Sequence, residues 1–190
     1  MAALFQAGPS GLSSFLPNKV PAMSITPYDL SIPAFQRGFT VLAKLLDKAE
    51  AFAEDNKIKP EILVNARLAP DMLSLAGQIQ RMSDTAKGAA ARLTGTAAPS
   101  FADDETTMAD LRARIEKTTA YLASVPEAAF EGAEDRTVVV KTRGGELSSS
   151  GRDYLLTFAL PNFYFHLTTA YAILRHNGVA VGKLDYLGRA

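Results

Sequence analysis

Hydrophobic side chains recur at alternating steps of three and four along four segments of the chain, a spacing typical of one face of an amphipathic helix. The first stripe follows Pro33 and runs from Phe35 to Ala53, the second runs from Met72 to Leu93, and the third from Met108 to Val125. The second helix is expected to begin at Pro70, because proline is favoured in the first helical turn. Acidic residues 103–105 are expected to begin the third.

The period changes between the third and fourth stripes. Residues 136–151, RTVVVKTRGGELSSSG, contain a β-rich run, a turn-like Gly144-Gly145 pair and a short polar run, which predicts a β-hairpin. An isolated hairpin is only marginally stable, so we expect it to lie against the helices. The fourth helix is expected to begin at Arg152 and to end at Asn177-Gly178. The pattern therefore predicts an all-α four-helix bundle with a short β-hairpin inserted between helices three and four.

Length and the character of the N-terminus predict the domain organisation. A chain of 190 residues suits one domain. Residues 1–22 are rich in small residues, Pro and Gly, and are expected to be a flexible tail, with the bundle domain spanning residues 23–190. No apolar run approaches the ~20 residues of a membrane span, and the tail lacks the features of a secretory signal. We therefore expect a cytoplasmic protein with no membrane partner.

Charge and composition exclude several kinds of site. Twenty basic and twenty acidic side chains cancel, so nothing favours nucleic acid as a partner. There is no Cys, and the two histidines are His166 and His176. Any metal would therefore use histidine, carboxylate, amide or water, and three histidines from one chain are impossible. The glycines lack the spacing of a phosphate-binding loop.

The stretch LPNFYFHLTTAYAILRHNG, residues 160–178, places Asn162 and His166 four residues apart on an otherwise apolar helix. Four residues are about one helical turn, so both side chains lie on one stripe and are expected to face the bundle interior. Inward polar groups need partners. Pro161 is expected to remove one backbone hydrogen bond and to kink the helix just before Asn162.

Several motifs together resemble the DUF1993 family, which is placed among the DinB/YfiT-like four-helix bundles. They are ARLAPDM at 66–72, SDTAKGAAARL at 83–93, FEGAEDR at 130–136, GRDYL at 151–155, LPNFYFH at 160–166 and TAYAILRHNGV at 169–179. The similarity covers roughly residues 23–188. It implies a DinB-like bundle that is often a homodimer, without a defined activity.

The wider DinB/YfiT-like group typically binds zinc or nickel through three histidines, one on the second helix and two spaced as H-x-x-x-H on the last, and some members transfer small thiols. Aligned on Leu174-Arg175, His166 falls on the second of the paired histidines and Asn162 on the first. Gln78 is the nearest candidate for the second-helix position, with Asp84 and Gln80 behind it. An amide is a much poorer ligand than imidazole for these metals, so the resemblance implies a degenerate metal site.

Three interpretations of the Asn162–His166 turn stay open. In the first, the pair hydrogen-bonds across the bundle, with Gln78 as the candidate partner, and only fixes packing. In the second, it belongs to a small-molecule pocket or catalytic site. In the third, His166 binds a metal with amides and a carboxylate. The leading hypothesis is a protein that binds a small molecule or a partner, and the alternative is an enzyme such as a divergent transferase. The candidate catalytic residues are His166 and Asn162, the candidate substrate-binding residues are Gln78, Phe158, Phe165 and Thr169, and no metal ligand or cofactor is assigned.

Overall fold

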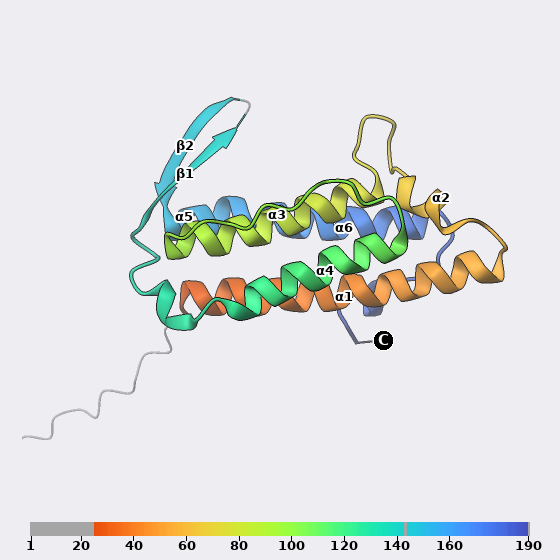
Figure 1. Cartoon of the computed structure of the whole chain (residues 1–190), viewed down its shortest axis with the longest axis horizontal. Helices are drawn as coiled ribbons and strands as arrows, with labels where there is room; N and C mark the ends of the chain where they lie inside the picture. The colour runs from red at the N-terminus through yellow and green to blue at the C-terminus, as the bar shows by residue number, and fades with distance from the viewer. Residues whose placement is uncertain (1–24, 143, 190) are drawn as a thin grey trace, which may run out of the picture.

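The computed structural model describes residues 25–142 and 144–189. Four long helices, α1 (Pro27–Asp55), α3 (Leu75–Thr94), α4 (Met108–Ser124) and α6 (Leu160–His176), lie side by side along the long axis (Figure 1). Both α1 and α3 pack against α4 and α6, which closes a single core. The predicted four-helix bundle is confirmed. The predicted boundary between residues 22 and 23 falls outside the described residues.

Helix α1 begins earlier than the hydrophobic stripe predicts. The Thr26 side chain accepts a hydrogen bond from the backbone of Asp29, and the Asp29 carboxylate accepts one from the backbone of Thr26. This reciprocal capping box starts the helix at Pro27, and Pro33 lies inside it. The capping residues Thr26 and Asp29, and not Pro33, therefore set the start of α1.

The segment before α3 also differs from expectation. A short helix, α2 (Pro60–Asn65), was not predicted, and α3 begins at Leu75 rather than at Pro70. Ser74 is the reason, because its side chain accepts the backbone N–H of Gly77 and caps the helix there. Likewise α4 begins after the capping residue Thr107, so residues 103–105 lie in the preceding loop and not in the helix.

The predicted hairpin is confirmed as β1 (Thr137–Thr142) paired with β2 (Gly145–Ser150). It follows a short 3₁₀ helix, η1 (Glu127–Phe130), and projects from one end of the bundle (Figure 1). Val138 and Val140 are buried and both strands contact the next helix, whereas Val139 and Leu147 are about half exposed. One face of the hairpin therefore joins the core, as its marginal stability requires.

The fourth helical region contains a π-helical turn instead of a simple proline kink. It consists of α5 (Gly151–Tyr154), the π-helix η2 (Leu155–Ala159) and α6. The N–H of Leu160 bonds to the carbonyl of Leu155, five residues back, immediately before Pro161. The wider turn accommodates the residue that cannot donate a hydrogen bond.

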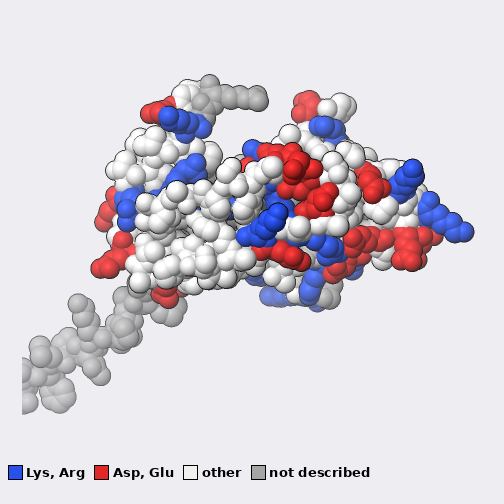
Figure 2. All heavy atoms as spheres, viewed as in Figure 1, with Lys and Arg blue, Asp and Glu red and all other residues white. Residues whose placement is uncertain are grey.

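The C-terminal segment packs on the bundle through α7 (Lys183–Tyr186). Val179 and Val181 are buried, and Lys48 of α1 forms an ion pair with Asp185 at 2.5 Å. Within the described residues, no helix is long and apolar enough to cross a bilayer. On the visible face, charged side chains gather over the half of the bundle where α1 ends, while the half where α1 begins is mostly uncharged apart from its margin (Figure 2).

Candidate functional site

His166 lies on the face of α6 that packs against α3. Its side chain is 9% exposed, and its Nδ1 atom lies 2.7 Å from Oε1 of Gln78, which is 2% exposed. The structure therefore brings together the two residues that the sequence proposed as neighbours. Their catalytic and binding roles stay predictions.

The amide of Gln78 fixes which nitrogen of His166 carries the proton. Nε2 of Gln78 donates to the carbonyl oxygen of Leu73 at 3.0 Å, so its Oε1 is the atom that faces the imidazole. Since Oε1 can only accept, Nδ1 of His166 must donate, and the lone pair of the neutral ring lies on Nε2. Among the described residues, Nε2 has no hydrogen-bond partner, and solvent reaches this atom. The site thus presents one free imidazole acceptor.

Burial keeps this imidazole neutral. Removal from water, together with the nearby positive charge of Arg81, lowers the pKa of His166 from 6.5 to about 4. A neutral ring matches the Nδ1–H donor that Gln78 requires. At neutral pH, His166 is therefore a hydrogen-bond acceptor and only a weak base.

The lowered pKa predicts a pH dependence of stability. Between about 6.5 and 4 the unfolded chain protonates this histidine and the folded chain does not, so the free energy of unfolding is greatest above this range and falls as the pH falls through it. We expect His166→Gln to remove on the order of 2 kcal/mol of this decline. Urea unfolding across this range measures it, and an unchanged decline in the variant would contradict the lowered pKa.

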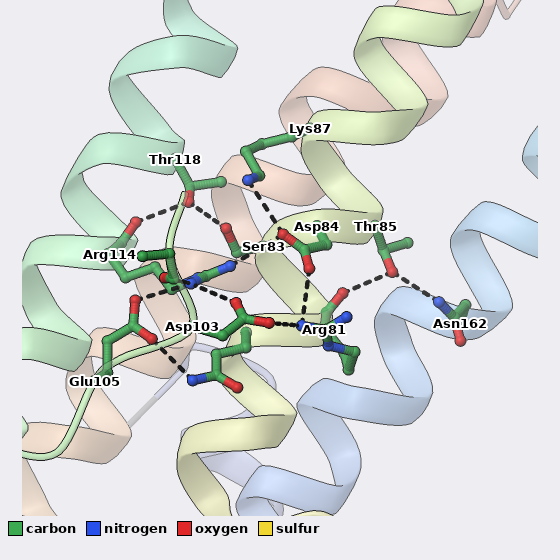
Figure 3. Close-up of polar contacts among 12 residues, drawn as sticks. Arg81, Ser83, Asp84, Thr85, Lys87, Asp103, Glu105, Arg114, Thr118 and Asn162 are labelled. Carbon is green, nitrogen blue, oxygen red and sulfur yellow. Dashed lines mark hydrogen bonds and ion pairs between the residues drawn. The ribbon is translucent and has the colours of Figure 1, made fainter. Parts of the chain in front are cut away.

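Asn162 forms a separate contact one turn away. Its Nδ2 donates to Oγ1 of Thr85 at 2.7 Å, and that hydroxyl donates to the carbonyl of Arg81 at 2.7 Å (Figure 3). Asn162 therefore holds α6 against α3 through Thr85, and no hydrogen bond joins it to His166 or Gln78. The shared stripe predicted from the spacing leads to two polar contacts, not to one cluster.

The other candidate residues lie on different sides of α6. Phe165 is 55% exposed and its ring lies edge-on to the imidazole of His166, 5.3 Å between centroids. With Thr169 and Leu68 it lines a shallow, largely apolar groove of about 390 Å³. Phe158 lies before α6, in the π-helix η2, and stacks on Tyr154. Phe165 and Thr169 thus border the His166 site, whereas Phe158 does not.

A buried charged network next to this site was not predicted. The side chain of Arg114 is 1% exposed and contacts Glu105 at 2.8 Å and both Asp84 and Asp103 at 3.0 Å (Figure 3). Arg81 pairs with the same two aspartates. The network ties the loop before α4 to α3 and holds the guanidinium of Arg81 beside His166.

The sequence did contain a signal for this network. Arg114 and Thr118 fall on the apolar stripe of Leu111, Ile115 and Leu122, at helical spacing, and so had to face inward. A buried arginine needs carboxylate partners. The preceding loop contains three acidic residues within reach of Arg114, and two of them, Asp103 and Glu105, pair with it.

The residues at this site do not fit a zinc or nickel ion of the three-histidine type. One imidazole nitrogen is free, the Gln78 oxygen is engaged by Nδ1 of His166, and Arg81 places a positive charge nearby. The weaker candidates are bonded elsewhere, Asp84 to Arg114 and Gln80 to Glu105. Within residues 25–142 and 144–189, no group of three or more histidine, aspartate or glutamate side chains could hold a metal ion.

The bundle with its inserted hairpin and polar contacts between α3 and α6 is a DinB-like fold. Residues 27–187 match the family model described as Domain of unknown function (DUF1993), and the chain belongs to this family. The crystal structure of a DinB family member protein from Shewanella denitrificans is similar over 85% of this chain and 91% of that chain, with 46% sequence identity and a TM-score of 0.78. No curated protein matches the chain. The predicted family and fold are confirmed.

Proposed function

We propose that this protein binds a small molecule beside α6, with His166 accepting a hydrogen bond from it and no resident metal taking part. The single observation that carries this proposal is the accessible lone pair on Nε2 of His166. The carbonyl of Leu73 orients the amide of Gln78, and Gln78 in turn places the ring proton on Nδ1, which leaves this lone pair free. The groove beside Phe165 offers an apolar surface for the rest of the ligand.

The pKa of His166 favours binding over acid–base catalysis. A general base works best when its pKa lies near the operating pH. With a pKa of about 4, the ring is neutral at neutral pH, so Nε2 carries no proton that it could give to a substrate and has only a weak tendency to accept one. An enzyme built on His166 and Asn162 would also need the two side chains to act on one substrate, and Asn162 instead donates to Thr85. Transferase activity is therefore the alternative, with less support.

Two small aromatic probes test this proposal. Phenol can donate a hydrogen bond to Nε2 and anisole, of similar shape, cannot. We expect millimolar phenol to shift the Nε2 resonance of His166 in ¹⁵N-labelled protein, because the lone pair accepts its hydroxyl, while anisole leaves that resonance unchanged.

The variant His166→Phe keeps an aromatic ring and removes the acceptor, so the backbone amides of Phe165 and Thr169, which respond more strongly to phenol than to anisole in the native chain, should respond equally to both. His176→Phe, at the exposed end of the same helix and outside the groove, is the matched control and should keep the preference. Equal shifts from both probes, or no response of His166 to phenol, would contradict the proposal.

The proposal also covers the oligomeric state of the protein and its compartment. We expect a cytoplasmic homodimer, because the chain has no cysteine and leaves apolar side chains exposed next to the site, among them Leu68, Leu73 and Phe165. Light scattering on purified protein measures the mass directly. A monomer at micromolar concentration would remove the homodimer from the account and leave the ligand site to be judged separately.

A further inference from the structure

A second and larger cavity lies at the end of the bundle where α1 begins. It has a volume of about 780 Å³, within the range of small-molecule sites. Its walls come from the start of α1, from η1 and the turn that follows, and from α5 and η2. This end of the molecule is mostly uncharged on the visible face, with both acidic and basic side chains at its margin (Figure 2). The cavity shares no lining residue with the groove beside His166.

Apolar and aromatic side chains form the body of this cavity. Tyr28 and Phe130 meet edge to face, 5.4 Å between ring centroids, and Leu30, Leu155 and Leu156 line the wall beside them. Leu156 is 43% exposed, so the wall is open to a ligand. Aromatic faces of this kind attract organic cations.

The charged groups of the cavity carry an excess of negative charge. Glu127, Glu131 and Glu134 line it against a single guanidinium, that of Arg152, and all four residues are exposed. Within the described chain, none of these four side chains forms an ion pair. The carboxylates are therefore available to a ligand of opposite charge.

The backbone of the wall is also unusual. Leu155 and Leu156 belong to the π-helix η2, and single π-helical turns occur frequently at functional sites. On the opposite wall, Gly132 has a φ of +67°, and a Cβ atom built there would meet no atom within 4 Å. The open space at Gly132 leaves room in the cavity that a larger residue would occupy.

We propose that this cavity binds an organic cation with an apolar body, such as an arylalkyl ammonium, whose ammonium group pairs with the carboxylates of η1 and its following turn. The aromatic pair and the leucines of η2 cover the apolar part. This site goes beyond the proposed function and does not depend on it, because it shares no lining residue with the surface around His166.

Backbone amide NMR on the full chain tests this site with three probes. We expect 2-phenylethylammonium to shift the amides of Gly132 and Leu156 saturably, because its charge complements the carboxylates. The anion 3-phenylpropanoate and neutral propylbenzene should shift these amides at least about tenfold more weakly at equal concentration, since neither can pair with a carboxylate.

A charge-neutralised variant isolates the carboxylates. The triple variant E127Q/E131Q/E134Q should lower the affinity for 2-phenylethylammonium about tenfold. The control E54Q/E61Q/E116Q makes the same charge change at exposed positions outside the cavity and should change the affinity less than about twofold.

Three results would overturn the proposal. They are equal binding of the anion, saturable shifts that lie outside the cavity, and the absence of any saturable shift. Nuclear Overhauser contacts between residues 1–24 and Leu156 in the free protein would also overturn it, because they would make the chain itself the occupant.

Discussion

Replacing Phe163 by alanine is expected to lower the free energy of unfolding by about 3–5 kcal/mol, the largest effect of any single substitution considered. The ring is fully buried, 4.7 Å from that of Phe35 and 5.5 Å from that of Phe39. It also lies against Gly38, where a Cβ atom would come within 2.5 Å of it. Truncation leaves a cavity that neighbours on two helices cannot fill. Urea denaturation at neutral pH measures the loss.

Phe165→Ala is the matched control for this prediction. Phe165 has the same side chain two residues further on, yet 55% of it is exposed. Its removal should cost less than about 1 kcal/mol, as is usual for surface positions. Equal losses from the two variants would mean that α6 is rotated about its axis, and His166 could then not face α3.

Replacing Arg114 by methionine is expected to cost about 2–4 kcal/mol, because it leaves the nearly buried carboxylate of Glu105 without its positively charged partner and with only the neutral amide of Gln80. Asp84 and Asp103 are 36% and 42% exposed, so water can solvate them and they add less. Urea denaturation at neutral pH measures this loss also.

Arg112→Met is the matched control, two residues earlier on the same helix. Arg112 pairs with Asp47 and Glu50 at the surface, so its loss should cost less than about 1 kcal/mol. A loss as large as that of Arg114→Met would contradict the special role of the buried network.

Acid should reduce the difference between the Arg114 variant and the native chain. Although burial alone would raise it, hydrogen bonds from Arg114 and Gln80 hold the pKa of Glu105 below its usual 4.5. The stabilisation is therefore present above this value and is lost as the pH falls through the lowered pKa in the folded protein. A constant difference through this range would show that Glu105 is not the partner that matters.

Much of the fold could be predicted because apolar periodicity reports burial directly. The four long helices and the hairpin follow from it. The helix starts were wrong where capping side chains decided them, as Thr26, Ser74 and Thr107 do. Capping side chains and prolines that lie a few residues apart both favour a helix start, and the spacing of apolar residues does not show which of them prevails.

The candidate site was predicted in part. Helical spacing correctly placed His166 inward, and Gln78 is its partner. The same spacing could not give Asn162 its separate partner Thr85, because that contact depends on how α3 and α6 are offset along their axes. Nor could it place Phe158, because the π-helix that contains this residue shifts the register before α6, and the ring stacks on Tyr154 instead.

The state of the His166 ring tests the central claim most directly. A long-range ¹H–¹⁵N correlation spectrum of the untagged protein reports the charge, the tautomer and any metal bond of each imidazole, and His166→Gln assigns the signal. At neutral pH, in the protein as purified and after one equivalent of zinc, we expect a neutral ring with the proton on Nδ1 and an uncoordinated Nε2. A protonated ring, a proton on Nε2 or a zinc-shifted Nε2 would contradict the account.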